Sequence, residues 1–561
     1  MFNPVPADDK RFHWPRQCVW LKLNGSWPLK SAKDFQSELD ATESYSTFLY
    51  SLWSWYVILS VGVTIVYQTA FLITNFGDIM MTTENCCTTF MGALNFVRLL
   101  HMRLNQNQFR RVIEQFVNNI WINREHHPQV AHECENRMST FRVMTILLSC
   151  LIAMYCLLPL IILFVDVGWN APEKPFPYKM LFPYDAHHGW RYAFTYAFTS
   201  YAGICVVTTL FAEDSIFGFF VTYTCGKFRL LHQRIDNIIS DSNELIRKHQ
   251  NDNDIQRICE KKLNEIAYDH NKLIEFSNRL EHFFNPILLV NFLISSVLIC
   301  MVGFQLVTGQ DMFIGDYVKF IVYISSSLSQ LYILCWNGDD LIQHSTETAK
   351  HLYGCNWEGV TLNIQNAKRL PNWHRVEVFH LTSIHPTNKE FRQNLQIMIL
   401  CSQRPVKITA LKFSILSLQS FTAILSTSMS YFTLLQTVYN ADQEEDHKLT
   451  MGLLILHYTC FEHFLIIITN LRAFICMPKA NINKLRSLIL PLNLILDNSS
   501  GISVTSDNIS MRLVNSSARC FSFGPPSNET MSSNDLYAVL QQIKRLSGKK
   551  ELIKTWNNLL K

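Results

Sequence analysis

The stretch FSILSLQSFTAILSTSMSYFTLLQTVY, residues 413–439, contains no charged side chain and is long enough to cross a lipid bilayer as one helix. It is nevertheless rich in hydroxyl groups. On a helix, several of these recur at steps of three or four residues and share one face; they belong to Thr422, Ser426, Ser430, Thr433 and Thr437. Such a polar stripe is typical either of a close-packed helix interface or of a surface lined by water. The stripe alone leaves both interpretations open.

Six further apolar runs of about 20 residues precede this stretch and are candidate membrane helices. They span residues 47–74, 79–100, 143–165, 192 to beyond 221, 286–307 and 317–336. Another run at 451–477 is a candidate extra membrane helix, although Glu462 and Arg472 interrupt it. The 561 residues are 48% hydrophobic and 17% charged, whereas roughly 25% is charged in a typical soluble chain. The composition therefore predicts a membrane protein.

Lysine and arginine are unevenly distributed among the connections between these runs. They are frequent before the first run and after the second, fourth and sixth, whereas the other connections contain only Lys174, Lys179 and Arg191. Positively charged connections tend to stay in the cytoplasm, so we expect a cytoplasmic N-terminus. Residues 1–46 lack a signal peptide pattern, and we expect the first helix to be retained. The sequence thus predicts an all-α membrane protein with seven transmembrane helices.

The connections expected on the inner side are long and have a helical pattern. Residues 254–280 place apolar side chains at helical spacing among many charges, which is typical of an amphipathic helix. We expect such inner helices to form a cytoplasmic anchor layer. Glu213 and Asp214 agree with this, because two carboxylates in mid-bilayer would be costly. We expect the fourth helix to leave the membrane near Phe211; the alternative is an intramembrane ion site.

Several classes of function find no support in the sequence. The 16 cysteines lack zinc-site spacing, and His457 and His463 do not share a helix face, so we expect no metal ion and no other cofactor. No nucleophile elbow, phosphate-binding loop or kinase motif is present, which argues against an enzyme. The net charge of +4 and the lack of basic runs with interleaved aromatics indicate no nucleic-acid partner. A G-protein-coupled receptor is excluded by the expected orientation.

Aromatic side chains gather in the parts of the helices that we expect to face outward. The candidate ligand pocket consists of Tyr155, Phe194, Tyr196, Phe198, Tyr201, Phe320 and Tyr323. The connection WNAPEKPFPYKMLFPYDAHHGW, residues 169–190, is stiffened by proline and could cover an apolar cavity as a lid. The alternative for each aromatic residue is ordinary packing or a place in an interfacial aromatic belt.

Three stretches resemble the insect odorant receptor family. They are EDSIFGFFVTYTCGKFRLL at 213–231, QLYILCWNGDDLIQHSTETAKHLYGCNW at 330–357, and FRQNLQIMILCSQRPVKITALKFSILSLQSFTAILSTSMSYFTLLQTVY at 391–439. The match covers most of residues 45–440, and the family's inverted topology agrees with the charge distribution. The connection between the fourth and fifth helices is too short for the family's co-receptor, so the resemblance is to a tuning subunit.

This resemblance implies an odorant-gated, non-selective cation channel in the plasma membrane of olfactory sensory neuron dendrites. A tuning subunit binds a small volatile odorant in an outer transmembrane pocket and forms a heterotetramer with the odorant receptor co-receptor within the membrane lipid. Its last helix lines the pore, and the family's gate aligns with Leu434, Thr437 and Val438. The stripe then faces ions, and the pore and gate residues are Ser426, Ser430, Thr433, Leu434, Thr437 and Val438.

Two alternatives remain beside this interpretation. One is a taste-type channel of the same superfamily, and the other is a seven-helix receptor or transporter that acts without a co-receptor. The stretches around Trp357 and Ser430 argue against the taste-type channel. A transporter would need internal repeats or helices broken at mid-bilayer, and the sequence contains neither.

We expect three regions in the chain: a cytoplasmic N-terminal segment at 1–46, the seven-helix channel domain at 47–440, and an extension at 441–561. The extension is atypical, because family members end within a few residues of the pore helix. It carries four glycosylation sequons, at Asn498, Asn508, Asn515 and Asn528. Its Ser/Asn-rich part is too polar to form a core. We expect the extension to be dispensable for gating.

Overall fold

The computed structural model describes most of the chain up to residue 444. The described residues are 18–28, 41–75, 79–169, 171–238, 252–309, 314–355, 357, 360–362, 381–383, 389–444, 502–504 and 511–513. The chain divides into two compact units, Met1–Ile424 and Leu425–Lys561, and each is described by itself. The predicted helix at 451–477 and the four predicted glycosylation sites lie outside the described residues.

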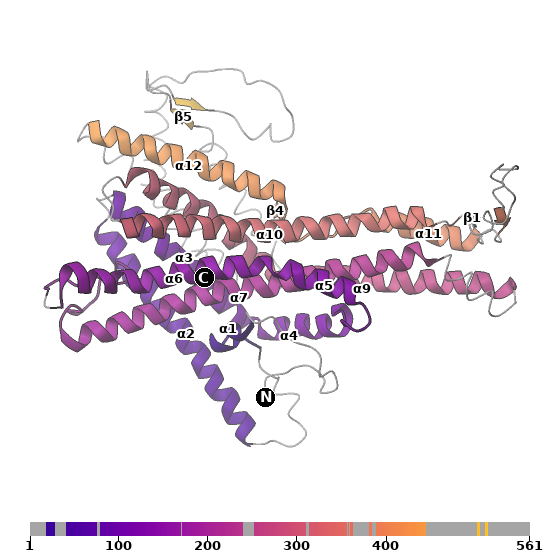
Figure 1. The fold of residues 1–561 in the computed structure, drawn as a ribbon, viewed down its shortest axis with the longest axis horizontal. Coiled ribbons are helices and arrows are strands. Elements are labelled where there is room, and N and C mark those ends of the chain that lie inside the picture. Colours follow the sequence, from indigo (N-terminus) through magenta and orange to yellow (C-terminus); the bar gives the residue numbers. More distant parts are fainter. Residues whose placement is uncertain are drawn as a thin grey trace, which may run out of the picture. The chain divides into compact units, whose positions relative to one another are not determined.

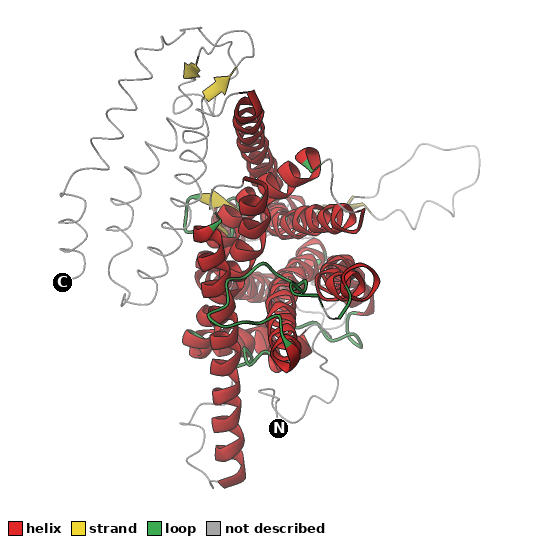
Figure 2. Ribbon diagram, turned by 90° about the vertical axis from the view of Figure 1, so that its left-hand side faces the viewer, coloured by secondary structure: helices red, strands yellow, loops and turns green. Residues whose placement is uncertain are grey.

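Helices make up nearly all of the described chain (Figures 1 and 2). Each of the seven expected spans lies in a helix of its own. These helices are α2 (Ala41–Thr74), α3 (Ile79–Leu104), α6 (Thr140–Ile162), α7 (Gly189–Asp236), α9 (Asp252–Thr308), α10 (Ile314–Gly354) and α12 (Leu418–Glu444). The shorter elements are α1 (Cys18–Leu23), α4 (Gln106–Gln115), α5 (Pro128–Met138), α11 (Lys389–Ser402), and the π-helical turns η2 (Phe116–Ile120) and η3 (Leu163–Val167).

Five helical segments in the described part of the chain are long and apolar enough to cross a membrane. They are Thr47–Thr74, Pro128–Val165, Gly189–Asp236, Cys259–Thr308 and Ile314–Gly354. These five coincide with the first, third, fourth, fifth and sixth spans expected from the sequence. Helices α3 and α12 are less apolar, in keeping with the amides and hydroxyls that their sequences carry.

The strands form three short antiparallel hairpins. They pair β1 (Val360–Leu362) with β2 (Leu381–Ser383), β3 (Thr409–Ala410) with β4 (Ser414–Ile415), and β5 (Ile502–Val504) with β6 (Met511–Leu513). In the second hairpin, Leu411 and Lys412 have positive φ angles of 47° and 64°. The Phe413 N–H donates to the Ala410 carbonyl at 3.0 Å, which closes a tight turn of the hairpin type.

This hairpin corrects the predicted start of the seventh helix. The sequence suggested that the helix begins at residue 413, but α12 begins at Leu418. Residues 413–417 belong instead to the turn and to β4. The Ser417 hydroxyl then accepts a hydrogen bond from the Ser420 N–H at 3.3 Å, as an N-terminal cap does.

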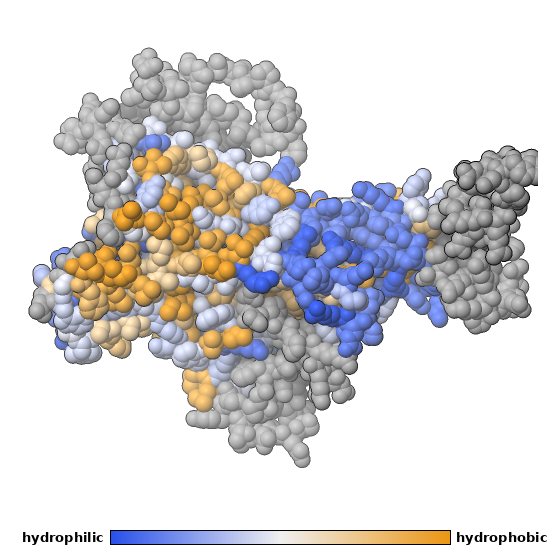
Figure 3. All heavy atoms as spheres, viewed as in Figure 1, coloured by the Kyte–Doolittle hydropathy of each residue, from blue (hydrophilic) through white to orange (hydrophobic). Residues whose placement is uncertain are grey.

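Three helices are far longer than a bilayer requires. α7, α9 and α10 contain 48, 57 and 41 residues, which corresponds to about 72, 86 and 62 Å. The hydrocarbon core measures only about 30 Å. Figure 3 shows apolar side chains over one part of the helical surface and hydrophilic ones around α5, α9 and α11. The amphipathic stretch at 254–280 is indeed helical and continues into the fifth span as a single helix.

A buried ion pair joins four helices in the first unit. Arg98 on α3 is 1% exposed, and its guanidinium lies 2.8 Å from the Asp214 carboxylate on α7. Arg98 also donates to the side-chain oxygen of Asn291 on α9 at 3.0 Å, and Gln330 on α10 donates to Asp214 at 2.7 Å. Breaking such a pair by removing one partner typically costs about 3–5 kcal/mol. The carboxylates of Glu213 and Asp214 thus face Arg98, a partner that the sequence analysis had not assigned to them.

The start of α12 rests against α10 at a glycine. A Cβ atom on Gly338 would collide with the carbonyl oxygen and the side chain of Leu416. Leu416 is fully buried and lies two residues before α12. Gly338 therefore allows the backbone before α12 to approach α10 closely.

We predict that Gly338→Ala destabilises the protein by about 1–3 kcal/mol, the usual cost of overpacking. Alanine alone should favour the helix by about 1 kcal/mol, so a loss of stability would report the collision with Leu416. Thermal unfolding of the purified protein measures the effect. Gly354→Ala is the matched control, because a Cβ there has nothing within 4 Å. Equal melting temperatures for the two variants would contradict the prediction.

Candidate ligand-binding site and pore helix

Five helices enclose a cavity of about 50 Å³ next to the connection that precedes α7. Its lining is mostly apolar, with several hydroxyl groups. The lining residues are Thr64, Gln68, Thr88, Met91, Gly92, Leu151, Ile152, Tyr155, Tyr178, Met180, Thr199, Ala202, Gly203, Val206, Val207 and Tyr323. We call this space the inner cavity.

A second, outer cavity of about 220 Å³ adjoins the first. It is lined by Glu84, Asn85, Thr88, Met154, Tyr155, Leu158, Pro159, Ile162, Pro175, Phe176, Pro177, Tyr178, Lys179, Asp316 and Lys319. Thr88, Tyr155 and Tyr178 line both cavities. The rings of Tyr155 and Tyr178 stack with their centroids 5.3 Å apart. This pair of tyrosines forms the partition between the two spaces.

The connection between η3 and α7 contributes one of these tyrosines. We call residues 171–188 the strap, which Figure 2 shows as loop near the end of the helices. Polar contacts with three helices hold it. Lys179 forms an ion pair with Glu84 of α3 at 2.6 Å, and the Leu181 N–H donates to the Tyr67 carbonyl of α2 at 3.1 Å. On α7, the Tyr192 hydroxyl donates to the Pro175 carbonyl at 2.8 Å, and the Thr195 hydroxyl lies 2.8 Å from that of Tyr184. The stretch predicted as a lid is thus a loop tied to the helices, and its side chains help to line both cavities.

Gly203 on α7 allows the strap to approach the helix. A Cβ atom on Gly203 would collide with the hydroxyl and ring of Tyr178. Tyr178 therefore lies directly over the α7 backbone, with its ring held between Gly203 and Tyr155. Even a single added methyl group on α7 would displace the partition.

The strap ends in a turn organised by Asp185. The His187 N–H donates to the Asp185 carboxylate at 3.1 Å, and His188 Nδ1 lies 2.8 Å from it. The hydrogen bond from the His187 backbone, followed by that from His188, lowers the pKa of Asp185 below its usual value. This turn fixes the chain immediately before α7 begins.

The outer cavity has a charged rim. Glu84 lies 2.6 Å from Lys179 and 3.5 Å from Lys319, and Lys319 lies 2.7 Å from Asp316. The Lys319 ammonium group also lies 5.2 Å from the Tyr155 ring centroid, within range of a cation–π contact. Because these charges compensate one another, the rim favours no strongly charged ligand.

Of the seven predicted pocket residues, the structure places Tyr155 and Tyr323 at the inner cavity. Tyr196 is buried among Leu163, Tyr192 and Phe176, and its hydroxyl donates to the Cys156 carbonyl at 2.6 Å.

The other four lie away from the lining. Phe320 is buried beside the Lys319 ammonium group, Phe194 is 64% exposed, and Phe198 is half-buried. Tyr201 packs against Trp53 and Tyr56 of α2. The seven residues therefore do not form a single cluster.

The sequence analysis missed part of the lining. Tyr178 and Met180 come from the strap, Thr64 and Gln68 come from α2, and Gly203 makes room for Tyr178. The aromatic, proline-rich composition of the strap was a signal for the first two. The α2 residues carried no signal, because a polar side chain in a membrane helix can face a neighbouring helix instead.

Two tyrosine hydroxyls at the inner cavity differ in their hydrogen bonding. The Tyr323 hydroxyl donates to the Cys87 carbonyl at 2.9 Å. The Tyr155 hydroxyl is buried and has no hydrogen-bond partner in the described part of the chain. Leaving a buried polar group unpaired costs about 1–3 kcal/mol. A ligand with an acceptor oxygen could relieve this cost.

The inner cavity lies two helical turns away from the buried ion pair, on the same helices. Three helices each carry a lining residue and, seven residues later, a member of the ion-pair network: Met91 and Arg98, Val207 and Asp214, Tyr323 and Gln330. Seven residues are two helical turns, so each pair lies on one face, about 10 Å apart. The network therefore holds together the same three helices that line the cavity.

The polar stripe of α12 is solvent-exposed in the structure. Ser426, Ser430, Thr433 and Thr437 are exposed, Leu434 is half-buried, and Leu435 on another face is 7% exposed. The stripe hydroxyls donate to backbone carbonyls three or four residues earlier, at 2.8–3.0 Å for Ser430, Thr433 and Thr437. Their oxygens keep free lone pairs that point outward as acceptors. The Val438 side chain lies outside the described residues.

Comparison with known proteins shows which family this chain resembles. Residues 75–429 match the family model described as 7tm Odorant receptor. The chain is 58% identical over 447 residues to Odorant receptor 13a of Drosophila melanogaster, covering 79% of this chain and 100% of that protein. It is 24% identical over 417 residues to Odorant receptor 82a of the same species, covering 72% and 96%.

This chain belongs to the odorant receptor family. Its fold is similar to that of the insect olfactory receptor OR5 from Machilis hrabei in complex with eugenol, with a TM-score of 0.59 and 14% identity. The match covers 75% of this chain and 97% of OR5.

Membership of the odorant receptor family confirms several sequence-based predictions. The odorant receptor is an all-helical, multi-span membrane protein of olfaction and a transmembrane ligand-gated channel, not an enzyme.

We predict different effects for the two cavity tyrosines of this odorant receptor. Tyr155→Phe removes a hydroxyl without a partner, so thermal stability should not fall, while responses to acceptor-bearing odorants should need about fivefold higher concentrations, equivalent to about 1 kcal/mol. Tyr323→Phe removes the hydrogen bond from the Tyr323 hydroxyl to the Cys87 carbonyl and should destabilise the protein by about 0.5–1.5 kcal/mol. Dose–response curves and thermal unfolding measure the two effects. An unchanged Tyr155→Phe response to every odorant would contradict the first part.

Proposed function

We propose that this odorant receptor binds a small, largely apolar odorant between α3, α6, α7 and α10, at the site now divided by Tyr155 and Tyr178. The observation that carries the proposal is this partition: one stacked pair of tyrosines separates an apolar cavity of about 50 Å³ from an outer cavity of about 220 Å³. The inner cavity alone is too small, because ligand sites typically measure about 300–1,000 Å³.

Moving the Tyr178 ring would join the two cavities into one site. Such a movement requires a shift of the strap, which carries Tyr178 and is tied to α3 through Lys179 and Glu84. Binding an odorant is thereby coupled to a displacement of the strap relative to α3 and α7. Apolar burial, at about 25 cal/mol per Å², supplies most of the affinity, and the Tyr155 hydroxyl orients an acceptor oxygen.

The proposed response is the opening of a non-selective cation path along α12. The chain acts as a tuning subunit in a heterotetramer with the odorant receptor co-receptor, in the plasma membrane of olfactory sensory neuron dendrites. Seven spans with a cytoplasmic N-terminus match the charge distribution. Ser426, Ser430, Thr433 and Thr437 offer weak, successive acceptors to hydrated cations, and Leu434 with Val438 forms a constriction that closes by dewetting.

Recordings from cells that express this chain with the co-receptor test the proposal. An odorant panel should evoke an inward current that discriminates poorly between sodium and potassium, because residues 413–439 carry no charge that would select one ion. The co-receptor is required in this proposal, so this chain alone should give no odorant current. A current from this chain alone would favour a receptor that works without the co-receptor.

We predict that a cysteine at Thr437 reacts with a water-borne thiol reagent in open channels and partly changes the current. Its control is Leu435→Cys, because Leu435 lies about 160° from Thr437 around the helix, two residues at about 100° each. Thr437 is exposed whereas Leu435 is buried, so the Leu435→Cys channel should react less. Equal inertness of the two cysteines would show that the stripe is a packing surface.

A further inference from the structure

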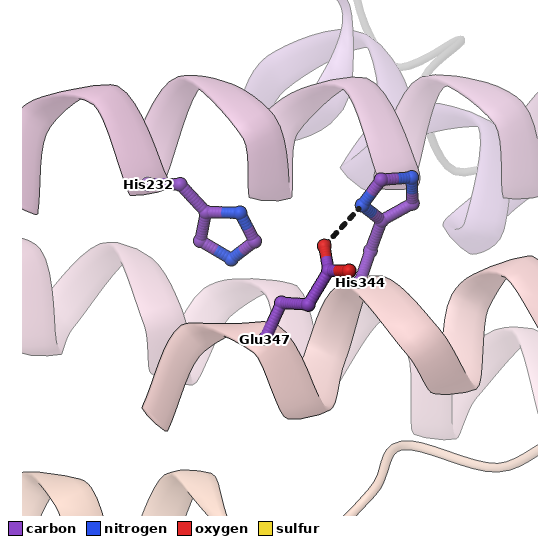
Figure 4. A group of neighbouring side chains, drawn as sticks. All are labelled: His232, His344 and Glu347. Atoms are coloured by element: carbon purple, nitrogen blue, oxygen red, sulfur yellow. Dashed lines mark ion pairs between the residues drawn. The ribbon is translucent and has the colours of Figure 1, made fainter. Parts of the chain in front are cut away.

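A second group of polar side chains lies between α7 and α10, far from the cavities. It consists of His232 on α7 with His344 and Glu347 on α10 (Figure 4). His232 follows the cavity residue Val207 by 25 residues, or about 37 Å along the helix. The group therefore belongs to the part of the two helices that extends beyond a bilayer's thickness.

The three side chains point toward one another across the gap between the helices (Figure 4). One potential ligand atom from each lies within 4.8 Å of the others. His344 Nδ1 lies 3.4 Å from the Glu347 carboxylate, and the two residues share a helix face, three positions apart. His232 and His344 are 5% and 7% exposed, whereas the Glu347 side chain is 28% exposed. The site is thus buried on the histidine side and accessible on the glutamate side.

One ring nitrogen of His344 is available as a metal ligand. Its Nδ1 is buried without a hydrogen-bond partner in the described part of the chain. Its Nε2 lies 3.8 Å from Asp340, the kind of outer carboxylate that orients a metal-bound imidazole. A cation shared with the Glu347 carboxylate, which lies 3.4 Å from Nδ1, would satisfy this buried nitrogen.

His232 is positioned by neighbours from both helices. Its Nε2 lies 3.0 Å from the Thr348 hydroxyl, and its ring stacks on that of His351 with centroids 4.3 Å apart. His351 is in turn 2.8 Å from Asp236. The His232 ring is therefore held in place between the two helices by Thr348 and His351.

The nearby guanidinium groups are engaged with carboxylates. Arg137 lies 2.8 Å from Asp340, and Arg229 forms an ion pair with Glu133. Their charges are thus compensated locally, which lowers the repulsion that a bound cation would meet.

We propose that His232, His344 and Glu347 bind a divalent transition-metal ion, Zn²⁺ foremost, and that the ion bridges α7 and α10. Two imidazoles and one carboxylate form a donor set that suits zinc and leaves a fourth position for water. The sequence analysis expected no metal ion, because it looked for donors close together in the chain. His232 and His344 are 112 residues apart and meet only through the packing of α7 on α10.

The test measures zinc binding to the full-length protein, purified in detergent and treated with a chelator. Wild type should retain one zinc ion per chain after dialysis, and zinc should raise its melting temperature. His344→Asn combined with His232→Asn should abolish this binding. Glu347→Gln should weaken it by at least the roughly 10–100-fold that loss of an outer-shell partner costs.

His132→Asn is the matched control, because His132 is an exposed histidine outside the cluster; this variant should bind zinc as wild type does. Glu347→Gln separates loss of zinc binding from loss of folding, because Glu347 is partly exposed and glutamine keeps the side-chain shape. A Glu347→Gln protein that melts like metal-free wild type but binds zinc more weakly would support the site. Equal zinc affinity in wild type, Glu347→Gln and the double variant, or no zinc retained by wild type, would overturn it.

Discussion

The Arg98–Asp214 ion pair constrains the whole helical unit. A guanidinium removed from water is tolerated only where carboxylate and amide oxygens surround it, and here those oxygens come from Asp214 on α7 and Asn291 on α9, with Gln330 on α10 completing the network. Four helices must therefore converge on one point. The lining residues of the inner cavity lie two turns away on three of these helices, so the shape of the cavity depends on the same contact.

Helices α7 and α10 both contribute residues to the inner cavity, to the ion-pair network and to the histidine group. Along α7, the cavity lining gives way to the ion pair and then to His232; along α10, Tyr323 is followed by Gln330 and His344. At the cavity, the strap closes the site through Tyr178, whose ring needs Gly203 on α7 and Tyr155 on α6 to stay in place. A ligand that displaces Tyr178 therefore acts directly on the α7 backbone at Gly203.

Much of this architecture could be predicted from the sequence, because apolar runs and helical spacing are local properties. All seven expected spans are helices, and 254–280 is an amphipathic part of α9. Only two of the seven predicted pocket residues, Tyr155 and Tyr323, line the inner cavity. Spacing places Tyr155 and Phe194 along their helices but does not say how each helix is rotated in the bundle. The Arg98–Asp214 contact joins residues 116 positions apart, which one sequence cannot pair. The start of α12 was missed because Leu411 and Lys412 give no sign of a turn with positive φ.

The most direct test of the account is a double-mutant cycle on the ion pair, read as thermal stability of the purified receptor. Arg98→Gln and Asp214→Asn should each be strongly destabilising, because each breaks the 2.8 Å contact of the pair. Asp214→Asn leaves Arg98 only the more distant Glu213 carboxylate at 3.9 Å. Combined, they remove both charges, and the double variant should be more stable than the sum of the single effects predicts, by about 1–3 kcal/mol. Additive effects, within about 0.5 kcal/mol, would show that the receptor does not depend on this contact.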